Sequence, residues 1–109
     1  MPVAKRAFNM KASINTLTMN IKREHFAKIL AGTKVVEYRS MSAYWMTRLT
    51  KVGPVPFRLR LLNGMTPPVP EATVMVTGVV LDQATQRIQF HLGAIVEVVN
   101  WNREANWPK

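Results

Sequence analysis

Residues 29–40, with the sequence ILAGTKVVEYRS, decide the fold because they join the end of an amphipathic helix to a short strand. Gly32 suits the left-handed position that ends many helices. The β-branched and aromatic residues that follow it favour a strand over residues 35–39. Side chains alternate along a strand, so Val35, Glu37 and Arg39 share one face, with Glu37 and Arg39 roughly 7 Å apart. With Lys34 at the strand entrance, we expect this segment to form the ligand site.

A carboxylate between two cations stays ionised, and it accepts hydrogen bonds rather than donating a proton. This favours a role for Glu37 in binding a base or sugar over a role as a general acid. The alternative interpretation is a structural ion pair that closes the edge of a sheet.

The residues before this segment predict a strand followed by a helix. Apolar and polar residues alternate over residues 14–21, which indicates a strand. Asn20 suits the N-cap of a helix over residues 22–30, whose buried stripe is Phe26, Ile29 and Leu30. His25 lies beside that stripe, and we interpret it as a packing residue rather than a catalytic base.

A second helix is expected over residues 43–52, capped by Ser42. Tyr44 and Arg48 lie four residues apart on one helical face. An exposed aromatic ring beside an arginine is a stacking platform for a base in nucleic-acid-binding proteins. It is equally an ordinary helix-surface pair.

Residues 57–62 alternate Phe57, Leu59 and Leu61 inward with Arg58 and Arg60 outward. The two arginines would contact phosphates, although a solvated strand face has the same pattern. Asn63, another candidate ligand residue, then begins a turn into a proline-rich loop.

The C-terminal half predicts further strands over residues 73–81 and 87–101, the latter being one bent strand or two strands broken at Gly93. Glu97 would need a partner if it faced inward. We expect residues 103–109 to form an irregular tail. The chain is therefore expected to be α+β, with residues 14–102 forming a small β-barrel of about five or six strands and two short surface helices.

Charge is the strongest signal of the composition, with 15 Lys and Arg against 6 Asp and Glu among 109 residues, a formal net charge of +9. Such a basic chain attracts polyanions, nucleic acid first, although the charge also serves solubility alone. Residues 1–13 contain three cations and no acid, and we expect them to form a flexible basic arm.

Several functional classes are excluded by composition. The chain has no cysteine, which excludes disulfides and thiolate zinc sites, and its two histidines argue against any metal site. No apolar run reaches the length of a membrane span, and no secretory signal is evident. We expect a cytoplasmic protein without metal, cofactor or membrane partner.

Residues 32–39, GTKVVEYR, carry the pattern Gly-x-Lys-x-x-Glu-x-Arg, and further short segments accompany it over residues 17–102: LTMNI (17–21), YW and RL (44–49), LNG (62–64) and FHLGAI (90–95). This order resembles that of ASCH domains (activating signal cointegrator homology), small barrels related to the PUA fold. The chain is similar to the small bacterial and phage proteins of this type. The resemblance implies that RNA or a nucleoside binds in a cleft beside Lys34, Glu37 and Arg39.

The ASCH family also contains ribonucleases and amidohydrolases that deacetylate N4-acetylcytidine. The amidohydrolases use a lysine that matches Lys34, a threonine where this chain has Glu37, and a glutamate from a longer insertion than the turn at residues 82–86. If this chain is an enzyme, the resemblance implies Lys34 and Glu37 as its catalytic residues. The leading hypothesis is an RNA- or nucleoside-binding module; a hydrolase is the alternative, and an interaction protein in which the motif only holds the barrel together is the third.

Overall fold

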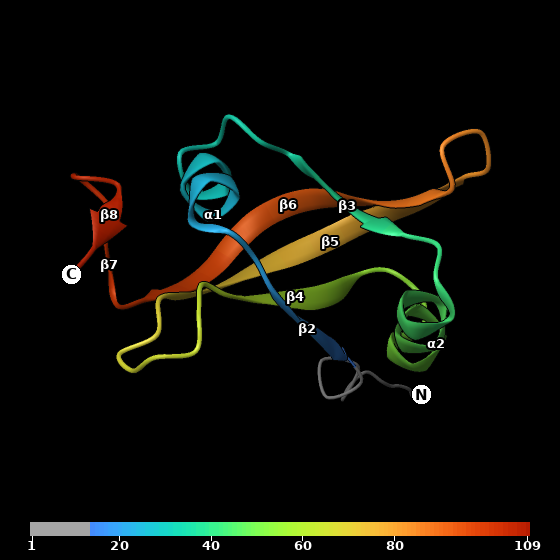
Figure 1. Ribbon diagram of the computed structural model, residues 1–109, viewed down its shortest axis with the longest axis horizontal. Helices are drawn as coiled ribbons and strands as arrows, with labels where there is room; N and C mark the ends of the chain where they lie inside the picture. The colour runs from blue at the N-terminus through green and yellow to red at the C-terminus, as the bar shows by residue number, and fades with distance from the viewer. Residues whose placement is uncertain (1–13) are drawn as a thin grey trace, which may run out of the picture.

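The structure, a computed structural model, describes residues 14–109, and the basic arm expected at residues 1–13 lies outside them. Within residues 14–109, two helices and seven strands follow one another (Figure 1). In order they are β2 (Thr16–Asn20), α1 (Arg23–Leu30), β3 (Val36–Ser40), α2 (Ala43–Val52), β4 (Phe57–Leu62), β5 (Glu71–Asp82), β6 (Arg87–Val99), β7 (Trp101–Asn102) and β8 (Trp107–Pro108).

Five strands form one curled sheet in the order β2-β4-β5-β6-β3, and β7 and β8 form a separate hairpin. Among the strand pairs that the structure describes in this sheet, β2 and β4 run parallel and the others are antiparallel. Figure 1 shows α1 and α2 near opposite ends of the sheet. The sequence predicts an α+β chain with a small barrel of five or six strands and two helices; the structure confirms the α+β class and a curled, barrel-like sheet of five strands.

Alternating apolar residues of β4 pack with apolar residues of β5 and β6 at the centre of the core. Phe57, Leu59 and Leu61 point inward as predicted and are at most 1% exposed. The ring of Phe57 meets that of Phe90 edge-on, with centroids 6.4 Å apart. Because the inner face of each strand is apolar, burial of these side chains sets the register of the sheet.

The two longest strands, β5 and β6, bend together. Their pairing shifts register between Thr73 and Gly78, and such bulges increase strand twist and curl a sheet. Of the two predictions for the C-terminal half, the single bent strand is correct, since β6 runs unbroken through Gly93. A side chain at Gly93 would meet the Thr77 methyl group at 2.9 Å, so glycine allows the two strands to approach there. Glu97 is exposed and therefore needs no buried partner.

Two local predictions are wrong. The helix α1 is preceded by Lys22 as its N-cap residue, without a side-chain cap, because Asn20 is the last residue of β2 and pairs with Leu62. The segment expected to be irregular contains β8, which pairs with β7 and packs on α1. Trp101 of β7 lies 4.8 Å from the ring of Phe26.

Candidate functional site

A cleft of about 910 Å³ opens where the two edge strands of the curled sheet, β2 and β3, approach each other. The end of β2, the start of α1, β3 and the turn after β4 contribute to its wall. Its lining residues are Asn20, Ile21, Lys22, His25, Lys34, Glu37, Tyr38, Arg39, Asn63, Gly64, Met65 and Arg87. The structure thus brings together Lys34, Glu37, Arg39 and Asn63 of the residues that the sequence predicts.

Lys34, which lines the cleft, is positioned by the turn at the end of α1. Gly32 has φ +81°, the left-handed conformation expected of it, and lets the chain turn back toward the helix. The backbone N–H groups of Thr33 and Lys34 both donate to the carbonyl of Lys28, at 3.0 and 3.2 Å. This turn delivers Lys34 to the first residues of β3.

Glu37 is 4% exposed and forms two ion pairs. Lys34 Nζ lies 3.3 Å from Oε1, and Arg39 Nη1 lies 3.1 Å from Oε2. Glu37 and Arg39 therefore share a face of β3, as predicted. Val35, assigned to the same face, lies before the strand and is 60% exposed, because β3 begins only at Val36.

Arg39 links three elements around the cleft. Its Nη2 donates to the carbonyl of Asn20 on β2 at 2.8 Å, which ties the two sheet edges together. Its guanidinium lies 5.3 Å from the ring of Trp45 on α2. The Nε atom of Arg39 is buried and has no hydrogen-bond partner within residues 14–109. A buried donor without a partner favours an acceptor from a bound molecule or water.

Asn63 lies in the cleft wall with its side chain already engaged. Its Nδ2 donates to the carbonyl of Ile21 at 3.0 Å, and its Oδ1 accepts from Arg23 Nε at 2.9 Å. Asn63 therefore holds the turn after β4 against the start of α1, and it shapes the cleft through these contacts.

Sequence reasoning missed Tyr38 and Arg87 as cleft residues. The Arg87 guanidinium lies 4.3 Å from the centroid of the Tyr38 ring, and Lys34 Nζ lies 5.4 Å from it. Arg87 is the first residue of β6 and pairs with Ser40 of β3. Alternation along β3 places Tyr38 on the face opposite Glu37 and Arg39, so the sequence did not predict its place in the cleft, and only the strand pairing brings Arg87 to it. His25, expected to be a packing residue, is half-buried and also lines the cleft.

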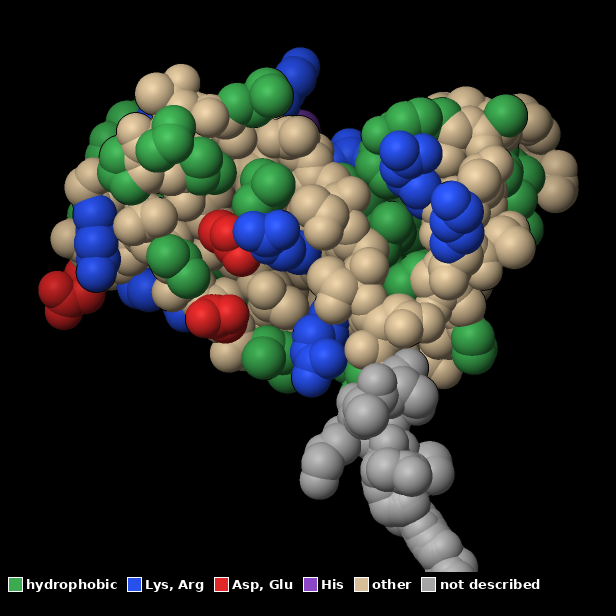
Figure 2. Space-filling view, turned by 90° about the horizontal axis from the view of Figure 1, so that it is seen from below, with side chains coloured by type: hydrophobic (Ala, Val, Ile, Leu, Met, Phe, Trp, Pro, Cys, Tyr) green, Lys and Arg blue, Asp and Glu red, His purple; other side chains and the backbone are tan. Residues whose placement is uncertain are grey.

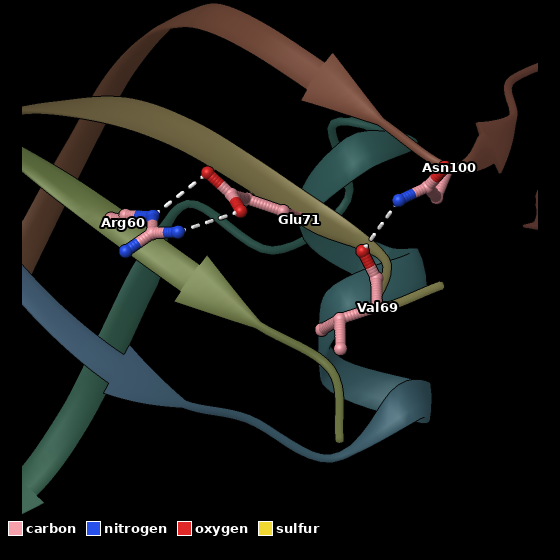
Figure 3. Close-up of polar contacts among 4 residues, drawn as sticks. All are labelled: Arg60, Val69, Glu71 and Asn100. Carbon is pink, nitrogen blue, oxygen red and sulfur yellow. Dashed lines mark hydrogen bonds and ion pairs between the residues drawn. The ribbon is translucent and has the colours of Figure 1, made fainter. Parts of the chain in front are cut away.

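The four other predicted binding residues do not line this cleft. On α2 the Arg48 guanidinium stacks on the Tyr44 ring, 3.5 Å from its centroid. On β4, Arg58 is half-buried, while Arg60 forms a two-pronged ion pair with Glu71 of β5, at 2.8 and 3.0 Å (Figure 3). The hydrogen bond from Arg60 is the main reason that the pKa of Glu71 lies below its ordinary value.

Metal and membrane signals are lacking in the described part of the chain. Residues 14–109 contain no cluster of three or more histidine or acidic side chains suited to a metal ion. None of the helices in this range is long and apolar enough to cross a membrane. Comparison of the chain with protein-family models, with curated proteins and with solved structures gives no match.

Proposed function

We propose that this chain is an ASCH-type protein with a PUA-like barrel, and that its cleft binds RNA or a nucleoside. The observation that carries the proposal is the buried carboxylate of Glu37, held between Lys34 and Arg39 at the seam of the sheet. The curled five-stranded sheet and the order of the motif after the first helix support the family assignment.

The chemistry of the cleft suits a nucleotide. Lys22, Lys34 and Arg87 supply positive charge for a phosphate, and the exposed ring of Tyr38 offers an aromatic surface for a base. Each oxygen of Glu37 retains acceptor capacity beyond its one ion pair, so the carboxylate can accept hydrogen bonds from an exocyclic amino group.

The contacts that Glu37 makes favour a binding function over hydrolysis. Both of its oxygens contact cations, and taking a proton from a nucleophile would weaken one of these ion pairs. Catalysis by a family hydrolase would instead require Lys34 and Glu37 to activate a nucleophile and protonate a leaving group. Measurement of turnover distinguishes the two functions.

The test measures the binding of a labelled single-stranded RNA by fluorescence anisotropy at several salt concentrations. We expect affinity to fall steeply with salt, because phosphate contacts release counterions. Lys34→Gln should weaken binding about ten- to hundredfold, the effect of losing one hydrogen bond to a charged group. Lys28→Gln, which removes the same charge from the exposed side of α1, is the matched control and should have a small effect.

The same proteins are incubated with N4-acetylcytidine and with a structured RNA, and the products are separated by chromatography. If the parent protein turns over either substrate and Lys34→Gln does not, the protein is a hydrolase rather than a binding module. Equal RNA affinity for the parent, Lys34→Gln and Lys28→Gln would show that the cleft is not the binding site.

A further inference from the structure

A second, smaller hollow lies beside the beginning of β2. It has a volume of about 450 Å³ and is formed by β2 and α2, with no acidic residue among its lining residues. These are Asn15, Thr16, Leu17, Thr18, Arg48, Lys51 and Val52. We refer to this hollow as the α2 groove. Its polar lining consists of two cations, two hydroxyl groups and an amide, which is the set of side chains that contacts phosphate oxygens in nucleic-acid complexes.

Arg48 is fixed in position before any ligand binds. Its guanidinium stacks on the Tyr44 ring, and its Nη1 donates to the Tyr44 carbonyl at 3.3 Å. Other N–H groups of Arg48 have no protein partner in the described chain. Lys51 follows three residues later on α2, and both side chains line the groove. A preordered cation loses less conformational entropy on binding.

The charge around α2 is uncompensated. In Figure 2 the acidic side chains lie in the left half of the face shown, whereas the charged side chains visible in the right half are Lys and Arg. The ion pairs of the described residues involve Lys34, Arg39 and Arg60, the last with Glu71 (Figure 3), and none involves Arg48 or Lys51. The α2 groove therefore presents positive charge that is not cancelled by an ion pair among the described residues.

The α2 groove and the cleft both border β2. Within residues 14–109, one edge of β2 pairs with β4 and the other has no strand partner. Thr16 and Thr18 of β2 line the groove, while Asn20 lines the cleft. The Cα atoms of Thr16 and Asn20 are about 13 Å apart along an extended strand, so one nucleoside in the cleft does not reach the far end of the groove.

Building on the proposed function, we propose that the α2 groove binds a backbone phosphate of the same RNA strand whose nucleoside occupies the cleft. The RNA strand then runs along β2 from the cleft to the groove. Its base or ribose contacts Glu37 and Arg39, and a phosphate further along contacts Arg48 and Lys51. The consequence is that the ligand is a single-stranded oligonucleotide and that a free nucleoside binds only part of the site.

The experiment compares two ligands on the full chain. A labelled single-stranded RNA of about ten nucleotides, within the range of site sizes of small single-strand binders, reports on both hollows by fluorescence anisotropy. A mixture of the four ribonucleosides, followed by ligand-observed NMR, reports on the cleft alone. The variant is Arg48→Gln with Lys51→Gln. The matched control, Arg103→Gln with Lys109→Gln, removes two exposed charges from the C-terminal segment, outside both hollows.

We expect the Arg48 and Lys51 double variant to bind the RNA at least about tenfold more weakly than the parent. The slope of log affinity against log salt concentration should decrease in magnitude by about 1. Binding of ribonucleosides should be unchanged. Lys51→Gln alone, which changes an exposed side chain, should also weaken RNA binding. This single variant replaces the double variant in the test if Arg48→Gln disturbs α2.

Two outcomes would contradict phosphate binding in the α2 groove while leaving the proposed function intact. One is RNA affinity of the double variant equal to that of the control; the other is RNA binding by the parent no tighter than ribonucleoside binding. A parent that binds neither ligand overturns the groove and the proposed function together.

Discussion

Glu37 is the residue on which the cleft depends, because it is a carboxylate placed almost entirely out of water. Burial of a charge is costly unless ion pairs and hydrogen bonds replace its hydration. Lys34 and Arg39 provide those contacts at 3.3 and 3.1 Å. The same three side chains thus hold the seam of the sheet and form the surface that a ligand meets.

Glu37→Ala should lower the free energy of unfolding by about 2–3 kcal/mol, because Arg39 and Lys34 lose their partner in a poorly hydrated position. Urea denaturation measures this change. Glu104→Ala, at an exposed glutamate in the C-terminal hairpin, is the control and should shift the free energy by no more than about 0.5 kcal/mol. Equal stability of the two variants would show that Glu37 does not hold the seam.

Much at this scale follows from local pattern. Alternation along residues 36–40 predicts that Glu37 and Arg39 share a face, and Gly32 predicts the turn that precedes Lys34. The sequence does not predict that Arg39 also reaches Asn20, nor that Arg87 lies beside Tyr38. Those contacts depend on the pairing and curvature of strands that lie far apart in the chain.

Among the elements, β4 and β5 are joined by a cross-strand ion pair between Arg60 and Glu71 (Figure 3). Arg60 holds the pKa of Glu71 below its ordinary value of 4.5. A carboxyl group with a lowered pKa in the folded state stabilises the fold above its unfolded-state pKa. That stabilisation is lost as the pH falls through the lowered value.

Glu71→Gln should therefore reduce the loss of stability between neutral pH and about pH 3, because the variant has no proton to take up at this position. The free energy of unfolding is measured by urea denaturation at both pH values. Arg60→Gln should reduce the same difference, because the Arg60 hydrogen bond is the main cause of the shift. An effect of Glu71→Gln without one of Arg60→Gln would assign the shift to another group.

Element types were predictable where periodicity extends over several residues, as in α2 with its Ser42 cap and in β4. Element ends were less predictable. Asn20 has the chemistry of an N-cap, but pairing with Leu62 and the hydrogen bond from Arg39 keep it in β2. Local propensity of about 1 kcal/mol at a cap is smaller than the gain from these tertiary contacts.

At the scale of the whole molecule, the C-terminal hairpin holds α1 in place. Trp101 is 3% exposed and packs against Phe26, and Asn106 bridges the two segments. Asn106 accepts from the Trp101 indole at 3.1 Å and donates to the carbonyl of Ala27 at 3.2 Å. A second anchor, Asn100, donates to the carbonyl of Val69 at 3.0 Å and ties the proline-rich loop to the end of β6 (Figure 3).

The two tryptophans of this hairpin should differ in their effect on stability. Trp101→Ala should cost about 3–5 kcal/mol, because it removes a large buried side chain. Trp107 is 59% exposed and lies 5.3 Å from the Arg23 guanidinium, so Trp107→Ala should cost no more than about 1 kcal/mol. Thermal unfolding followed by circular dichroism gives both values. A small loss for Trp101→Ala would mean that the hairpin is dispensable for the fold.

The sequence by itself determined the α+β class, the inward residues of β4 and the composition of the Lys34–Glu37–Arg39 cluster. Each of these depends on the spacing of neighbouring residues, which periodicity records directly. Only the tertiary structure decided which strand edges meet, which basic residues surround the cleft, and that the last residues pack on α1. These features depend on the total burial and hydrogen bonding gained when distant segments pair, and no local pattern contains that sum.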